Sequence, residues 1–78
     1  MTVSMSTATI LKTEFPGGTG VGPIYIDGLQ VGDVIVALVP DSFMNWFEQV
    51  VSVDGQLQQT LDHDGSSVTF TAYLIRGV

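Results

Sequence analysis

Residues 34–39, Val-Ile-Val-Ala-Leu-Val, constrain the fold more than any other stretch. All six are apolar and four are β-branched. β-Branched side chains are stiff at χ1 and fit a pleated surface. Six residues is an ordinary strand length and far too short to cross a bilayer. Since a strand that is apolar on both faces is normally covered on both, we expect this one to lie mid-sheet or between two sheets.

Further stretches favour strands through alternation or β-branched content, namely residues 2–13, 24–27, 46–53, 56–61 and 67–76. Turn residues separate them, a spacing that is typical of small all-β domains. We therefore predict one all-β domain over residues 1–78, a small antiparallel β-sandwich or barrel of 5–6 strands. A jelly-roll-like order of the strands is one alternative for this domain. Residues 1–23 would form an N-terminal strand or arm and a glycine-rich loop. We expect residues 41–47 to form an irregular loop or a single helical turn.

Two segments predict which side chains point inward. Asp54-Gly55 is typical of a type I′ hairpin, in which both central residues need positive φ, and this register puts Val53 opposite Gln56. One hairpin face would then carry Trp46, Val50, Leu57 and Leu61, and the other Phe47, Val51 and Val53. The cleanest alternation lies in residues 67–76, where one face carries Val68, Phe70, Ala72 and Leu74, and the other Thr69, Thr71, Tyr73 and Ile75. Since both faces of the hairpin carry apolar residues, we expect one of them to meet the core and the other a partner subunit.

Charge and composition exclude several classes of protein. The net charge is −6, with Lys12 and Arg76 as the only basic side chains, so direct binding of nucleic acid is not expected. No cysteine is present, which excludes disulfides and thiolate metal sites. The first residues carry neither a basic nor an apolar signal-peptide region, and no apolar run has the length of a membrane span. Because the chain is small and apolar, we expect a homo-oligomer.

The sequence offers no convincing catalytic or metal-binding group. The only histidine, His63, lies in a turn between Asp62 and Asp64. Three neighbouring residues of one turn cannot adopt the geometry of a catalytic triad. The turn faintly resembles a calcium-binding loop, but it supplies too few oxygen ligands for calcium. The glycine-rich loop, residues 15–23, lacks the Lys and the helix start of a phosphate-binding loop, and we expect it to be a flexible connection or a loop that contacts a partner. We therefore predict a protein that is not an enzyme and has no metal or cofactor site.

Aromatic and apolar side chains supply the candidate interface. Trp, Phe and Met are enriched at the centres of protein interfaces, but a single Trp in a small β domain is as often a core residue. Both interpretations stay open for Trp46. The candidate interface residues are Phe43, Met44, Trp46, Phe47, Tyr73 and Ile75.

Three stretches, Gly32-Asp33-Val34, Val51–Gln59 and Ser66–Arg76, together with Phe47, resemble the small virion proteins of tailed phages that decorate, cement or form fibres on the capsid. The resemblance covers roughly the last 45 residues. It implies a β-sandwich without an active site that assembles, commonly as a trimer, on the major capsid protein. It also implies synthesis in the host cytoplasm and a final location on the capsid surface of the virion.

Two alternatives remain open. One is a small carbohydrate- or peptide-binding β module, in which Tyr25 and Trp46 would form the platform and Asp62 and Asp64 the polar contacts. The other is a virion protein associated with the tail instead of the capsid.

Overall fold

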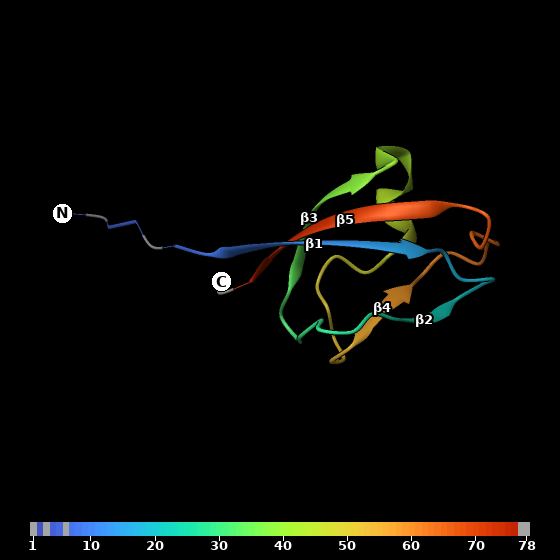
Figure 1. Ribbon diagram of the computed structural model, residues 1–78, viewed down its shortest axis with the longest axis horizontal. Coiled ribbons are helices and arrows are strands. Elements are labelled where there is room, and N and C mark those ends of the chain that lie inside the picture. The colour runs from blue at the N-terminus through green and yellow to red at the C-terminus, as the bar shows by residue number, and fades with distance from the viewer. Residues whose placement is uncertain (1, 3, 6, 77–78) are drawn as a thin grey trace.

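The computed structural model describes residues 2, 4, 5 and 7–76, and it contains two antiparallel sheets (Figure 1). The three-stranded sheet has the order β1-β5-β3, from β1 (Thr9–Pro16), β3 (Val34–Val39) and β5 (Thr69–Arg76). The two-stranded sheet pairs β2 (Gly22–Tyr25) with β4 (Gln56–Gln59). A 3₁₀-helix, η1 (Asp41–Trp46), follows β3. The prediction of a small all-β antiparallel fold is confirmed.

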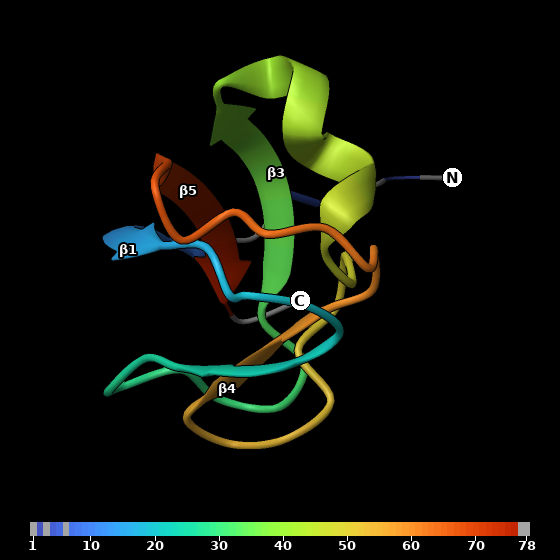
Figure 2. The ribbon, with the colours of Figure 1, turned by 90° about the vertical axis from the view of Figure 1, so that its right-hand side faces the viewer.

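The core lies between the two sheets, and β5 supplies its centre (Figure 2). The predicted alternation of β5 is confirmed, because Phe70, Ala72 and Leu74 are each at most 1% exposed. Opposite them stand inward residues of β1, with Phe15 paired to Phe70 and Leu11 to Leu74. The core is completed by Ile26, Leu29, Ile35, Leu38, Phe47, Val51 and Leu57.

β3 has the predicted bounds but not the predicted place. It is an outer strand of the three-stranded sheet, and on its other side it forms only an isolated bridge, from Val34 to Val50. A register shift between Ile35 and Ala37 lets Ile35 and Leu38, three residues apart, both point into the core. Val36 and Val39 stay 48% and 56% exposed. The expectation that both faces of this strand are covered is therefore wrong.

The predicted strand over residues 46–53 is also wrong. Trp46 ends η1, and the segment after it forms only isolated bridges. The amide of Ile35 donates to the carbonyl of Gln49, and Val51 and Asp33 are joined by a backbone hydrogen bond of 2.8 Å. The segment bridges β4 only at its ends, at Phe47–Gln59 and Val53–Gln56, while its middle bonds to the start of β3, so the predicted hairpin faces do not form. Phe47, Val51 and Leu57 are buried together, while Val50 and Val53 are exposed.

The turn at Asp54-Gly55 is confirmed in position and register, with Val53 bridged to Gln56. Its type differs from the prediction. Gly55 has φ +73°, but no described residue other than glycine has a positive φ, so Asp54 cannot occupy the first position of a type I′ turn.

The first residues of the chain lie outside the sheets. β1 begins at Thr9, whereas the predicted strand began at Thr2. The described residues before β1 (2, 4, 5, 7 and 8) are exposed, form no strand, and run away from the body (Figure 1). Val3, which the prediction included, lies outside the described residues. In the part of the chain that the structure covers, no helix has the length and apolar character needed to cross a membrane.

Gln59, on β4, ties the glycine-rich loop to the body. Its side chain is 1% exposed and accepts a hydrogen bond of 2.9 Å from the amide of Gly18. Its amide nitrogen donates to the carbonyls of Leu61 and His63. Gly17 passes so close to Gly65 that an added Cβ would lie 2.6 Å from the Gly65 carbonyl oxygen. The loop is therefore held against the body at Gly17 and Gly18, which argues against the flexible connection expected for it, while contact of the loop with a partner stays a prediction.

Asp33 and Arg76 form the other buried polar contact. The carboxylate is 1% exposed and accepts hydrogen bonds of 2.9 and 2.8 Å from the guanidinium and one of 2.9 Å from the Gln30 amide. The Arg76 guanidinium also donates to the carbonyl of Gly28, at 2.7 Å. The pair thus joins the end of β5 to the turns around residues 28–33. The hydrogen bonds from Arg76 hold the pKa of Asp33 below its ordinary value, although burial opposes them.

The fold should lose stability in acid through Asp33. Because folding lowers its pKa, Asp33 contributes its full stabilisation above the ordinary value of 3.8 and loses it as the pH falls below that value. Asp33→Asn should cost about 1.5–3 kcal/mol at neutral pH and flatten this acid dependence. Urea unfolding from neutral pH to pH 2.5 measures both effects. Asp27→Asn, at an exposed position, controls for the removed charge; an equal effect there would contradict the assignment.

The role of Gln59 can be tested against its neighbour on β4. Gln59→Ala leaves the Gly18 amide and two carbonyls without their partner, so we expect a loss of about 1–3 kcal/mol in the free energy of unfolding. Gln58→Ala, at a half-buried position whose side chain hydrogen-bonds Gln56 at 3.3 Å, should cost less than about 0.5 kcal/mol. Similar losses for both variants would show that Gln59 does not hold the loop.

Candidate functional site

The three-stranded sheet has one face turned away from the core, which we call the outer face. Cross-strand register identifies its side chains, because residues directly opposite in an antiparallel pair point to the same side. Tyr73 is opposite Lys12 on β1 and Ala37 on β3, and Ile75 is opposite Ile10 and Val34. The outer face consists of Ile10, Lys12, Glu14, Pro16, Val34, Ala37, Val39, Thr69, Thr71, Tyr73 and Ile75.

No other described strand or helix covers the outer face (Figure 2). Ile10 is 71% exposed and Val39 is 56% exposed, and Val36 in the bulge beside them is 48% exposed. Tyr73 and Ile75, between the flanking strands, are half-buried. A contiguous exposed apolar surface of this kind is typical of a site for association.

Charge on the outer face is confined to β1. Lys12 and Glu14 are both exposed there, and the Lys12 ammonium lies 6.0 Å from the centre of the Tyr73 ring. At this distance the cation contacts the ring face only weakly. Glu14 is the only one of the eight acidic residues on this surface, so the outer face is less negative than the rest of the chain.

Four of the residues predicted as an interface, Phe43, Met44, Trp46 and Phe47, pack on the core side of the sheet. Phe47 is 5% exposed and belongs to the core, with its ring 5.1 Å from that of Phe70. Phe43 and Trp46 are half-buried, with ring centres 4.8 Å apart, and Met44 packs beside them against the core. Phe47 therefore has almost no surface to offer a second chain. Contact of the other three with a partner stays a prediction, as it does for Tyr73 and Ile75.

The turn that holds the only histidine uses its polar groups locally. The Asp64 carboxylate accepts hydrogen bonds from the Ser66 hydroxyl and amide, at 2.6 and 2.9 Å, which hold the pKa of Asp64 below its ordinary value. The His63 ring stacks on Trp46, with ring centres 5.6 Å apart. Among residues 2, 4, 5 and 7–76, no three acidic or histidine side chains gather where a metal ion could bind.

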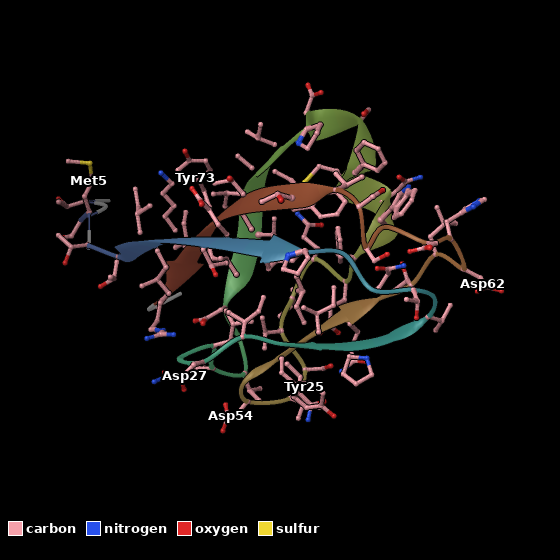
Figure 3. All side chains as sticks on the ribbon, turned by 45° about the vertical axis from the view of Figure 1, so that its right-hand side comes forward. Met5, Tyr25, Asp27, Asp54, Asp62 and Tyr73 are labelled. Carbon is pink, nitrogen blue, oxygen red and sulfur yellow. The ribbon has the colours of Figure 1, made fainter. Side chains whose placement is uncertain are left out.

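The two aromatic residues of the predicted ligand platform lie in different layers. Tyr25 is 77% exposed on the far side of β2, where it pairs with Gln56 (Figure 3). Trp46 packs against Phe43 and Phe70 at the end of η1, and His63 covers one face of its ring. Trp46 and Tyr25 therefore do not form one flat surface. Tyr25 with the half-buried Gln56 and Gln58 is the part of the predicted site that remains open to a ligand.

Sequence reasoning identified Tyr73 and Ile75 but missed most of the outer face. Ile10, Val36 and Val39 were assigned to no surface, because the position of β3 beside β5 is set by long-range pairing. The alternation of apolar residues along β1 and β5 could have identified Ile10, because outward residues of paired antiparallel strands share one face. Once Tyr73 is placed on the second face of β5, every residue opposite it shares that face.

Comparison with known proteins adds no relative. No family model matches the chain, and neither a curated protein nor a solved structure matches it.

The packing of Trp46 gives a test of its role. Trp46→Ala removes contacts with Phe43 and Phe70, so we expect the free energy of unfolding to fall by about 2–4 kcal/mol. Asn45→Ala, at the exposed neighbouring position, should change it by less than about 0.5 kcal/mol. Urea unfolding followed by far-ultraviolet circular dichroism measures both. A Trp46→Ala protein that keeps its stability but loses an oligomeric state would instead assign Trp46 to an interface.

Proposed function

We propose that this protein is a structural assembly protein that self-associates through the outer face and, as its resemblance implies, decorates or cements a phage capsid. The observation that carries the proposal is the uncovered apolar surface of the β1-β5-β3 sheet. Burial of apolar surface stabilises association by about 25 cal/mol per Å² before the costs of association are subtracted. Ile10, Val39 and the half-buried Tyr73 and Ile75 would provide this surface.

The distribution of charge favours association at this face. Copies with a net charge of −6 repel one another wherever their acidic surfaces meet. The outer face carries one acid, Glu14, and one base, Lys12. Contact between copies, or with a capsid subunit, therefore meets less repulsion here than at an acidic surface. A trimer on the major capsid protein is the arrangement that the resemblance implies. A tail-associated virion protein would use the same surface.

A ligand-binding module is the second candidate, and Tyr25 is the observation that favours it. Its ring is 77% exposed next to the amide side chains of Gln56 and Gln58, the residue types that bind sugar rings and hydroxyls. This surface belongs to the two-stranded sheet, on the opposite side of the core from the outer face. The two candidates therefore make separate predictions.

Charge substitutions on the outer face test the assembly proposal. Val39→Glu and Ile10→Glu place a carboxylate on exposed positions, so the fold should be retained while association through this face is lost. Sedimentation equilibrium should give a multiple of 8.3 kDa for the wild type, with a trimer expected, and a lower mass for both variants. Val31→Glu is the matched control, since Val31 is 60% exposed in a turn away from this sheet.

A wild type that stays monomeric at all concentrations, or variants that keep the wild-type mass, would contradict assembly through the outer face. A glycan-binding screen separates the second candidate. Binding that is lost in Tyr25→Ala and kept in Val39→Glu would move the function to the two-stranded sheet.

A further inference from the structure

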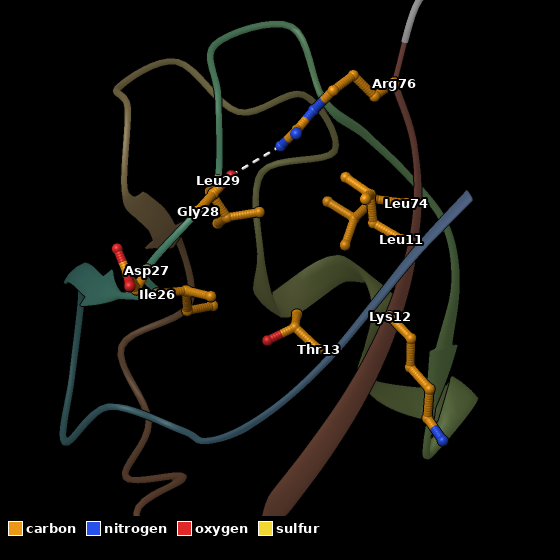
Figure 4. A pocket seen from close by; sticks show the side chains of 9 residues that line it. All are labelled: Leu11, Lys12, Thr13, Ile26, Asp27, Gly28, Leu29, Leu74 and Arg76. Atoms are coloured by element: carbon orange, nitrogen blue, oxygen red, sulfur yellow. Dashed lines mark hydrogen bonds between the residues drawn. The ribbon is translucent and has the colours of Figure 1, made fainter. Parts of the chain in front are cut away.

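A groove of about 320 Å³ opens along the edge of β1 that does not pair with β5 (Figure 4). Four apolar side chains point into it, namely those of Leu11, Ile26, Leu29 and Leu74. The hydrogen bond from Arg76 to the Gly28 carbonyl closes one end. The side chains of Asp27 and Lys12 point away from it. The groove is therefore apolar inside, although charged residues stand around it.

Backbone lines the groove on both sides. Its lining includes three consecutive residues of β1, 11–13, and four consecutive residues after β2, 26–29. Consecutive residues of a strand point alternately up and down, so a groove that touches all three runs along the strand's edge. β1 pairs only with β5, which leaves this edge without a strand partner in the described part of the chain. An unpaired edge of eight residues is a template for strand addition.

The chain carries a segment that suits this edge. We call residues 2–8, which precede β1, the arm. The arm contains no charged residue, no proline and no glycine. Its described residues are exposed, and Met5 is 99% exposed (Figure 3). Seven extended residues span about 23 Å, close to the length of β1. An unbranched methionine side chain adapts well to an irregular apolar groove.

The arm of the same chain is poorly placed to fill the groove. It continues directly into β1, so pairing with β1's own edge needs a tight reversal at about residues 7–10. Residues 7–10 contain none of the residues that favour such a reversal, glycine, proline, asparagine, aspartate or serine. A second copy needs no reversal. Because all eight acidic residues lie at position 14 or beyond, the uncharged arm can approach another copy without the repulsion that opposes contact between the bodies.

We propose that the arm of one copy adds as a strand to the free edge of β1 in a second copy, with Met5 in the groove between β1 and residues 26–29. The inference rests on the proposed self-association and adds to the outer face a second contact between copies, made by the arm. Main-chain hydrogen bonds along β1 give the pairing, and the apolar groove sets its register. The outer face stays available to a further contact, because the arm lies at the strand's edge.

Cross-linking between separately labelled chains tests the placement. The chain has no cysteine, so Met5→Cys protein can be mixed with Thr13→Cys protein and treated with a short bismaleimide. Thr13 lines the groove, while the adjacent Glu14 lies on the outer face. Peptide mass spectrometry should find links from residue 5 to residue 13 at least about tenfold above links to residue 14 in a Glu14→Cys mixture. Equal or higher yield at residue 14 would overturn the placement.

Deletion of residues 2–8 separates this inference from the proposed function. The deleted protein should stay folded, since the described arm residues form no strand with the body, but its mass by sedimentation equilibrium should fall. An oligomer whose mass survives the deletion would overturn the arm contact and leave outer-face assembly standing. A monomeric wild type would overturn both. A link from residue 5 to residue 13 within one chain, seen when both cysteines are in a single 8.3 kDa chain, would place the arm on its own groove.

Discussion

The structure depends on the one-sided burial of β5. This strand lies between β1 and β3, and its inward residues, Phe70, Ala72 and Leu74, are among the best buried of the described residues. Everything else in the fold is arranged beneath them. The two-stranded sheet, η1 and the turn around Leu29 all pack on this side. The same alternation that drives β5 into the core sends Tyr73 and Ile75 to a surface that has no layer above it.

A chain of 78 residues has little material for a second covering layer. β2 and β4 are four residues each, enough to close the inner side and no more. Two buried polar side chains hold the loops to the body of the fold through hydrogen bonds, where larger proteins use longer strands or helices. Asp33 joins the turns at residues 28–33 to Arg76, and Gln59 joins the glycine-rich loop to the turn after β4. The fold therefore keeps defined loops, while an apolar sheet face and an open strand edge stay uncovered.

Much of the architecture was predictable because local pattern decides it. The inner face of β5, the bounds of β3 and the turn at Asp54-Gly55 follow from alternation, β-branched content and turn chemistry. What failed depends on contacts distant in sequence. β3 looked like a central strand because its six residues are apolar, yet the bulge at Val36 and its place at the sheet's side are set by pairing with β5. The strand predicted over residues 46–53 does not form for the same reason, since the middle of this segment bonds to the start of β3 and only its ends bridge β4.

The candidate site was predictable only in part. Tyr73 and Ile75 follow from the alternation of one strand, whereas Ile10 and Val39 join them through pairing that no local pattern reveals. Phe47 was expected at an interface but lies in the core, because the segment that carries it is not a strand. Asp33 and Gln59 carry no signal at all. In the sequence both look like ordinary turn or surface residues. They become buried only in the folded protein, where their polar atoms hydrogen-bond to groups distant in sequence.

The most direct test of the central claim, that the outer face is a contact surface, compares the two tyrosines. Tyr73 lies on the outer face, and Tyr25 lies on the opposite sheet and serves as an internal control. Nitration rates of each can be followed by mass spectrometry in dilute and concentrated protein. The account predicts that Tyr73 becomes protected as concentration rises while Tyr25 does not. Unchanged reactivity of Tyr73, or protection of Tyr25 instead, would contradict it.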